Sequence, residues 1–282
     1  MPERRLGVHT SIAGGLDLSL ERADALACNT LQIFSHNPRG WAVNPMSEGD
    51  ASRFRVLRTE LDISPVYVHT SYLINIASRD ATLRRKSIDL LTVEMDRADS
   101  INADYVVLHT GSAAGDDESS SRKRAADALD EIARMGRWKA GLLLENTAGE
   151  KGDISSRIID MAEIMSAVRI PLISGICFDT CHGFAAGYDI RDEKGIRKIA
   201  DEIGESVGLD KLKLIHLNDS KGGVGSHIDR HEHIGSGKIG AKGLRKFINH
   251  PPFRYVPLIL ETPRKRESDD PTNLKYVRRM FR

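Results

Sequence analysis

The chain has 282 residues, of which 40% are hydrophobic and 29% charged, so it contains enough apolar material for a large folded core. Its formal net charge of +1 is too balanced to indicate a nucleic-acid partner, and no segment approaches the roughly 20 uninterrupted apolar residues that a membrane span requires. Its three cysteines are irregularly spaced, which argues against a disulfide framework. The opening residues MPERRLGVH lack the pattern of a signal peptide, and we therefore expect a cytoplasmic protein.

Eight short apolar segments recur along the chain and predict buried strands. They cover residues 4–9, 30–35, 65–69, 104–109, 140–145, 174–179, 212–216 and 256–261. Helices are predicted between them, over residues 80–101, 122–136, 193–206 and 240–249. Such alternation is typical of an α/β protein with a parallel sheet, and eight units fit a (β/α)8 TIM barrel formed by residues 1–282 as one domain. A doubly wound open sheet competes, but no G-x-G-x-x-G follows the first strand.

Acidic or imidazole side chains stand at the C-terminal end of almost every predicted strand. In chain order these ends are His9, Ser35, His69, His109, Glu145, Asp179, His216 and Glu261. In a parallel barrel the ends meet at one face, where the active sites of this fold lie. Desolvating so many carboxylates and imidazoles is costly unless cations compensate them, and both are ligands of zinc, manganese and iron. The pattern predicts a metal centre rather than a set of solvated turns.

Two connections add further donors. His182 follows Asp179 by three residues, so a tight turn would bring both side chains over the barrel mouth. The segment at residues 225–237 reads GSHIDRHEHIGSG. It holds four candidates, namely His227, Asp229, His231 and His233. In an extended strand all four would share one side, so spacing leaves open which of them bind. We interpret Cys177 and Cys181 as buried small residues rather than ligands.

The number of donors constrains the number of ions. Two donors from residues 227–233 join seven others, namely His69, His109, Glu145, Asp179, His182, His216 and Glu261. One four-coordinate ion cannot use all of them, and two would be saturated without an open position for a substrate. Three ions with one bridging carboxylate fit best. Three clustered cations would attract a polyanion and stabilise charge on a phosphoryl group, which indicates phosphodiester hydrolysis.

Several motifs carry a resemblance to a known family. They read VHTSIAGG at 8–15, VHTSYLIN at 68–75, VVLHTGS at 106–112, LLLENTAG at 142–149, GICFDTCHGFAAGYD at 175–189, HLNDSK at 216–221, DRHEHIGSG at 229–237 and LILETP at 258–263. On these motifs the sequence resembles endonuclease IV, the metal-dependent apurinic/apyrimidinic endonuclease of base-excision repair. The resemblance extends over essentially the whole chain.

The resemblance implies a trinuclear zinc site, with Mn²⁺ as an alternative at one or more positions. Its ligands would be His69 and His109 with Glu145 bridging, then Asp179, His216 and Glu261, and finally His182, Asp229 and His231. This leaves His227 and His233 outside the ligand set. Glu145 and Glu261 would be the catalytic carboxylates. Both would act mainly by placing the ions, and Glu261 would also orient the nucleophile.

The resemblance also implies a substrate and a reaction. A hydroxide held between metals would attack the phosphodiester 5′ to an abasic site in duplex DNA, leaving a 3′-hydroxyl and a 5′-deoxyribose phosphate. Arg39 in the loop HNPRGW, together with Tyr72 and Leu73, would insert into the DNA where the abasic nucleotide is flipped out. The expected partner is damaged double-stranded DNA, bound by a monomer that needs no membrane and no obligate protein partner.

Two rival functions remain open on the sequence alone. A sugar-phosphate isomerase or epimerase on the same barrel would also place carboxylates and imidazoles at strand ends around one or two metals. The additional His182, Asp229 and His231 favour the nuclease over this alternative. The second rival is a DNA-damage binder without catalytic activity, or a metal-dependent structural protein that has lost its activity.

Overall fold

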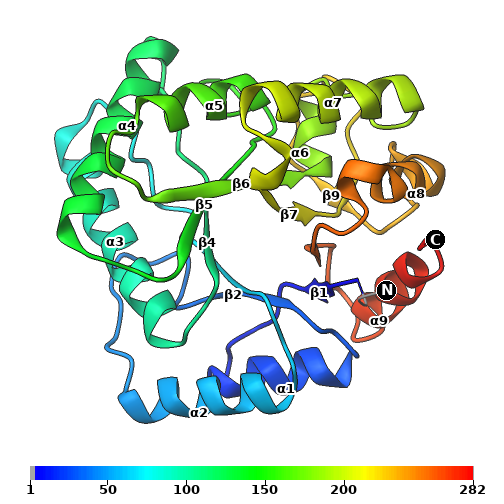
Figure 1. Cartoon of the computed structure of the whole chain (residues 1–282), viewed down its shortest axis with the longest axis horizontal. Helices are drawn as coiled ribbons and strands as arrows, with labels where there is room; N and C mark the ends of the chain where they lie inside the picture. The colour runs from blue at the N-terminus through cyan, green and yellow to red at the C-terminus, as the bar shows by residue number, and fades with distance from the viewer. Residues whose placement is uncertain (1–3, 282) are drawn as a thin grey trace.

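Eight parallel strands stand at the centre of the fold, and helices surround them on the outside (Figure 1). This computed structural model describes residues 4–281; Met1–Glu3 and Arg282, which belong to the predicted domain 1–282, lie outside the described residues. The barrel strands are β1 (Leu6–Val8), β2 (Leu31–Phe34), β3 (Val66–His69), β4 (Tyr105–Leu108), β5 (Gly141–Glu145), β6 (Ile173–Asp179), β7 (Leu212–His216) and β10 (Leu258–Leu260). A short hairpin of β8 (Asp219–Ser220) and β9 (His231–Glu232) follows β7.

The strand order β1-β10-β7-β6-β5-β4-β3-β2 turns the sheet back on itself. Where β1 meets β2, His9 and Gln32 form an isolated parallel bridge, and the Thr10 N–H donates to the Gln32 carbonyl at 2.8 Å. The eight strands predicted from the sequence are therefore all present, and the predicted TIM barrel is confirmed. No helix within residues 4–281 is both long enough and apolar enough to cross a membrane.

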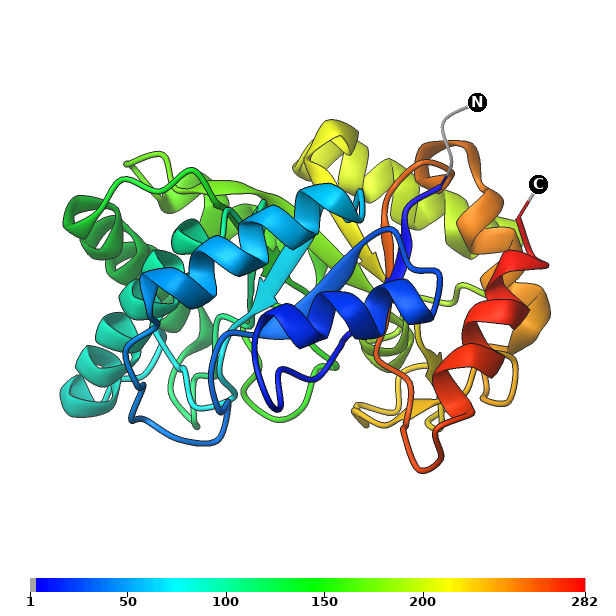
Figure 2. The ribbon, with the colours of Figure 1, turned by 90° about the horizontal axis from the view of Figure 1, so that it is seen from below.

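Helices connect the strands and cover the outside of the barrel. They are α1 (Asp17–Ala25), α2 (Glu48–Glu60), α3 (Ala81–Ser100), α4 (Glu118–Met135), α5 (Ile158–Ala167), α6 (Thr180–Ala185), α7 (Glu193–Ser206), α8 (Gly240–Asn249) and α9 (Asp269–Arg278), with short 3-10 turns at Leu209–Lys211 and Pro251–Phe253. Helix α4 begins four residues before its predicted start at residue 122, because the Asp117 carboxylate caps it by accepting from the Ser120 N–H at 2.7 Å. The connections that follow the strands gather along the lower edge of Figure 2.

The interior of the barrel is filled by one apolar layer. It consists of Tyr67, Val107, Leu143, Cys177, Leu214 and Ile259, each from a different strand. Side chains alternate along a strand, so the residue two positions later also points into the barrel. In all six strands that residue is a predicted donor, in the order His69, His109, Glu145, Asp179, His216 and Glu261. The donors therefore form the next layer of the barrel interior, above the apolar one.

Gly7 of β1 permits the close approach that brings the first and second strands together. A Cβ atom at Gly7 would lie 1.9 Å from the Thr30 carbonyl oxygen, which is backbone and cannot move aside alone. We predict that Gly7→Ala lowers the free energy of unfolding by about 1–3 kcal/mol through overpacking, as measured by chemical denaturation. The matched control is Gly223→Ala, where nothing lies within 4 Å of the added Cβ. A destabilisation as small as that of the control would contradict this account of barrel closure.

Candidate metal centre

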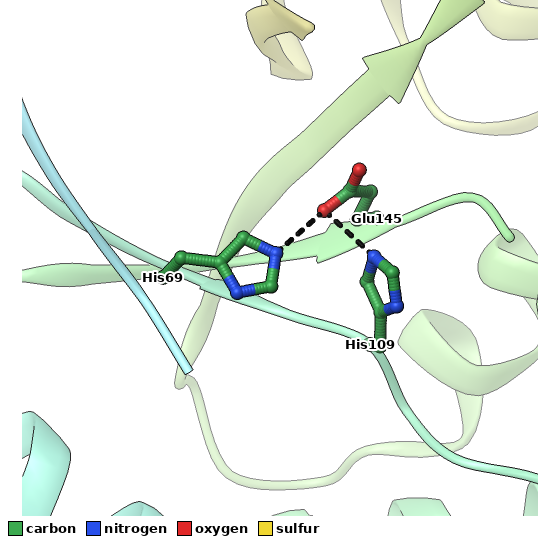
Figure 3. Close-up of side chains that lie close together, drawn as sticks. All are labelled: His69, His109 and Glu145. Carbon is green, nitrogen blue, oxygen red and sulfur yellow. Dashed lines mark hydrogen bonds and ion pairs between the residues drawn. The ribbon is translucent and has the colours of Figure 1, made fainter. Parts of the chain in front are cut away.

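Glu145 at the end of β5 is the central carboxylate of the barrel mouth, and it is completely buried. Its Oε2 lies 3.1 Å from His69 Nε2 and 3.0 Å from His109 Nε2 (Figure 3). Its Oε1 lies 2.8 Å from His216 Nδ1 and 3.4 Å from His182 Nδ1. One carboxylate thus contacts imidazoles from three other strands and from helix α6. His69, His109 and Glu145 form the first group of donors that could hold an ion.

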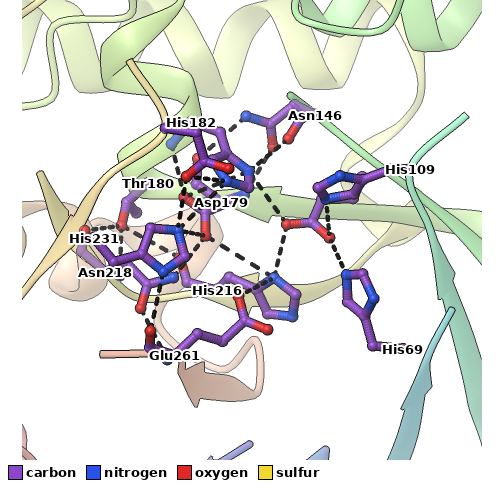
Figure 4. A network of polar contacts seen from close by, with 12 residues as sticks. His69, His109, Asn146, Asp179, Thr180, His182, His216, Asn218, His231 and Glu261 are labelled. Carbon is purple, nitrogen blue, oxygen red and sulfur yellow. Dashed lines mark hydrogen bonds and ion pairs between the residues drawn. The ribbon is translucent and has the colours of Figure 1, made fainter. Parts of the chain in front are cut away.

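A second group of donors consists of Glu145 and the donors at the ends of β6, β7 and β10. Asp179, His216 and Glu261 bring their ligand atoms, with one from Glu145, to within 4.8 Å of one another. His216 Nδ1 faces Glu261 Oε2 at 3.3 Å and Asp179 Oδ2 at 4.0 Å. Figure 4 shows Asp179, His216 and Glu261 lying near one another.

The third group lies toward the solvent. It consists of His182, Asp229 and His231. Helix α6 begins directly after Asp179, whose carboxylate caps it by accepting from the His182 N–H at 2.7 Å. The tight turn predicted here is therefore the first turn of a helix. His182 Nε2 lies 3.2 Å and His231 Nε2 3.6 Å from Asp229 Oδ1. The side chain of Asp229 is 44% exposed, whereas those of Glu145 and Asp179 are 0% exposed.

The hydrogen bonds behind the imidazoles fix which nitrogen faces the site. In three of these rings Nδ1 lies beside a backbone carbonyl oxygen, and because such an oxygen only accepts, Nδ1 must donate. The pairs are His69 with Thr70 O (2.8 Å), His182 with Asn146 O (3.0 Å) and His231 with Glu261 O (3.0 Å). Nε2 is then left free to take a proton or a metal ion. The two Nε2 atoms of His182 and His231 face each other at 3.4 Å. Two protons cannot both occupy that space, but one cation can, so this donor set fits a metal ion.

The electrostatics of the cluster also favour bound positive charge. Burial alone would raise the pKa of the Glu145 carboxyl, but His216 and His109 hold it well below its usual value. Burial lowers the pKa of His182, yet the carboxylates of Asp179 and Asp229 raise it well above its usual value. The Nε2 atom of His109 is buried without a hydrogen-bond partner, although it lies beside Glu145. Divalent ions would supply the charge that these carboxylates require and displace protons from the imidazoles.

Other predicted candidates take no place in the three groups. His227 has a left-handed backbone (φ 54°) and an exposed side chain, and His233 Nδ1 accepts from Asn273 Nδ2 at 3.1 Å. The segment is not one extended strand, because β9 covers only His231–Glu232. Cys177 and Cys181 lie close enough to be ligands, but burial raises the pKa of each thiol to about 12. Both residues are completely buried, which agrees with their interpretation as small residues of the interior.

Several residues that the sequence analysis overlooked hold the donors in place. Gln32, fully buried on β2, accepts from His216 Nε2 at 2.8 Å and donates to Glu261 Oε1 at 2.6 Å. Asn218 donates to Asp179 Oδ2 at 2.6 Å and accepts from the Glu261 N–H at 2.9 Å. The sequence does hold a sign of the role of Gln32, because it lies inside the apolar run TLQIFS. An amide on a buried strand is rarely left without a hydrogen-bond partner.

Asp219 positions the segment that carries the third group. Its carboxylate accepts from the backbone N–H groups of Ser220, Gly235, Gly237, Ile239 and Gly240, at 2.9–3.2 Å. These bonds tie the chain after β9 to β8. Asp229 and His231 lie between the two tied ends.

The predicted DNA-binding residues lie on the loops that follow β2 and β3. Arg39 is exposed on the loop after β2, Tyr72 is 63% exposed on the loop after β3, and Leu73 is half-buried beside it. The Tyr72 ring meets the edge of Phe34 at a centroid distance of 5.2 Å and lies 6.4 Å from the ring of His69. The Tyr72 side chain therefore stands near His69, at the edge of the mouth.

Comparison with known proteins agrees with this geometry. Residues 20–282 match the family model described as a xylose isomerase-like TIM barrel. A protein of Methanosphaerula palustris named probable endonuclease 4 is 41% identical over 279 residues, which cover 98% of each chain. The crystal structure of endonuclease IV from Thermus thermophilus superposes with a TM-score of 0.87, at 35% identity and 98% coverage of both chains. A D-tagatose 3-epimerase-like protein shares the fold at a TM-score of 0.72 and 17% identity, covering 97% of this chain and 96% of its own.

Gln32 offers a test of how far the surrounding hydrogen bonds control metal retention. We predict that Gln32→Leu, which preserves volume but removes both amide groups, weakens metal binding by roughly 10–100-fold. Elemental analysis after dialysis against a graded chelator series measures the effect. Ser121→Ala is the control, because its buried hydroxyl donates to the carbonyl of Asp117, the residue that caps α4. Metal content equal to that of the control variant would show that Gln32 is not needed to hold His216 and Glu261.

Proposed function

This chain belongs to the endonuclease IV family and is a nuclease, and from this premise we propose that it repairs DNA by cutting beside abasic sites. The proposed reaction is hydrolysis of the phosphodiester 5′ to an abasic nucleotide in duplex DNA, leaving a 3′-hydroxyl and a 5′-deoxyribose phosphate. The observation that carries the proposal is the arrangement of nine donors in three adjoining groups at one barrel mouth.

We assign one ion to each group. His69, His109 and Glu145 would hold the first, Asp179, His216 and Glu261 with Glu145 the second, and His182, Asp229 and His231 the third. Glu145 offers one oxygen to each of the first two groups, which supports a bridging role. Imidazole and carboxylate donors suit zinc, with manganese as an alternative.

The chemistry that bound divalent ions supply at such a site is Lewis-acid stabilisation of charge on the phosphate and ionisation of water near neutral pH. The chain's own contribution is to fix the positions of the donor side chains. Glu145 is fixed between four imidazoles, and Glu261 is oriented by Gln32 and by its backbone bond to Asn218. Glu261 thereby presents its free oxygen to the site, where it would also orient the attacking water.

The exposed side chains at the rim are proposed to bind the DNA. Tyr72 and Arg39 project where a duplex lying across the mouth would meet the protein, and Leu73 lies beside Tyr72. Aromatic and apolar wedges lower the cost of unstacking bases, and a guanidinium stacks and pairs with phosphate. These three residues would fill the space left by a flipped abasic nucleotide.

The third donor group distinguishes this proposal from a sugar isomerase. An isomerase of this fold needs one or two metals, for which the first two groups suffice. His182, Asp229 and His231 would then have no function, although Asp219 and helix α6 hold them in position. The shared fold with epimerases at under 25% identity does not favour that activity.

Incision of a duplex with one tetrahydrofuran site tests the function. We expect a single nick on the 5′ side of the lesion with zinc or manganese present, resolved by gel electrophoresis. Glu261→Gln keeps the shape of the side chain but removes its charge, and we expect it to lower the rate by roughly 100-fold or more. The control is Glu232→Gln, which lies on β9 outside the three groups. Absence of a nick by the metal-loaded wild type would refute the proposed activity.

Tyr72 is the test of the DNA-binding assignment. We predict that Tyr72→Ala weakens binding of abasic duplex about tenfold or more, because base–aromatic stacking is worth ~1–3 kcal/mol per base. Fluorescence anisotropy with a labelled abasic duplex measures the affinity. Metal content should not change. Val56→Ala, an exposed apolar residue of α2, serves as the control. A fall in metal content instead would mean that Tyr72 supports His69 rather than contacting DNA.

A further inference from the structure

Two loops carry the residues proposed to contact DNA, and both rest on the same helix. We call residues 35–44 the Arg39 loop and residues 70–75 the Tyr72 loop. Beneath them lies Glu94 of α3, whose side chain is 1% exposed. Glu94 belongs to none of the three donor groups. The metal centre therefore does not explain why a carboxylate is buried here.

The Glu94 carboxylate joins the two loops through a single oxygen. Its Oε1 accepts from the Ser71 backbone N–H at 2.9 Å, next to Tyr72. The same oxygen lies 2.6 Å from His36 Nε2, and that imidazole nitrogen donates to it from the Arg39 loop. One atom of the helix thus fixes one point in each loop.

Further bonds tie the loops to each other and to the helix. The Ser71 hydroxyl donates to Pro38 O at 2.7 Å and accepts from the Leu73 N–H at 3.2 Å. One turn after Glu94, Arg97 donates to Asn44 O at 2.9 Å and to Ser35 O at 3.2 Å, which holds both ends of the Arg39 loop. Arg39 and Tyr72 are each one residue away from the Ser71–Pro38 contact.

This arrangement is costly as a purely structural element. His36 Nδ1 and Glu94 Oε2 are both buried without a hydrogen-bond partner. A buried polar atom left unpaired costs about 1–3 kcal/mol, and apolar side chains of similar size would avoid that cost. Apolar side chains could not form the directional hydrogen bonds that attach both loops to Glu94.

We propose that Glu94, with His36, is a positioning residue that sets the relative placement of the Arg39 and Tyr72 loops for recognition of abasic DNA. The inference rests on the proposed function, because it concerns how the same mouth selects its substrate. Within residues 4–281 the Glu94 carboxylate forms its hydrogen bonds with His36 and the Ser71 N–H, and it acts on the donor His69 only through charge. Its loss should affect the binding of a lesion that both loops contact together, and not the chemical step.

The test compares Glu94→Leu, which removes the acceptor, with Glu94→Gln, which retains a carbonyl oxygen at the same place. For Glu94→Leu we expect KM for a tetrahydrofuran duplex to rise about tenfold, the effect of one lost hydrogen bond of roughly 1.4 kcal/mol. We expect kcat, metal content and affinity for undamaged duplex to remain those of the wild type. Glu94→Gln should recover most of the KM. Thr92→Val is the matched control, since its hydroxyl donates to Ile88 O within the same helix.

A second measurement needs no DNA. Hydrogen exchange of the Ser71 amide should accelerate in Glu94→Leu and stay slow in Glu94→Gln and Thr92→Val. If Glu94→Leu does not fold, His36→Ala replaces it, because that variant removes the other half of the same contact and should raise KM in the same way.

The outcomes separate the two proposals. A wild type that does not nick abasic DNA refutes the function, and Ser71 exchange then still shows whether Glu94 fixes the loop. With an active wild type, a lower kcat or metal content at unchanged KM would overturn the positioning role. A Gln variant as defective as the Leu variant would overturn it as well.

Discussion

The two-residue period of a β-strand determines where the chemistry of this protein can lie. Six strands each contribute one apolar side chain to the barrel interior, and two positions later each contributes an imidazole or a carboxylate. The apolar layer fills the barrel interior on the N-terminal side of the donors. The donors can therefore meet water only on their other side, at the barrel mouth. Helices and loops can differ in length without disturbing this arrangement. A one-residue shift in any of the six strands would turn a donor outward and bury the wrong neighbour.

Charge is the second constraint, and it follows from the first. Stacking carboxylates above an apolar floor removes them from water, which is tolerable only with compensating positive charge. One ring nitrogen is held by a hydrogen bond to a backbone carbonyl or to Gln32 in each of the imidazoles of His69, His182, His216 and His231. The other ring nitrogen therefore faces the carboxylates. The same logic extends to the rim, where α3 anchors both loops that reach toward the substrate.

The sequence predicts the parts that depend on local periodicity. Apolar runs and their terminal residues give all eight strands, and the barrel then brings the donors to one face. Distant pairing is not visible in the same way. Gln32 and Glu261 are 229 positions apart, so no local pattern indicates that they bond. The segment around His227 also resists prediction, because its left-handed residue breaks the alternation on which a strand-based interpretation relies. The family resemblance supplies what spacing leaves open there, by excluding His227 and His233 from the ligands.

Exposure is uneven among the donors: Glu145 and Asp179 are sealed, whereas the side chain of His109 is 33% and that of Asp229 44% exposed. Ions held by donors that differ in exposure would not have equal lifetimes in the site. A chelator approaching from solution would reach an ion held by Asp229 before one held by Asp179, which is fully buried. The metal content of a purified sample would then depend on how the sample was prepared, and a protein that had lost its most exposed ion would keep its fold.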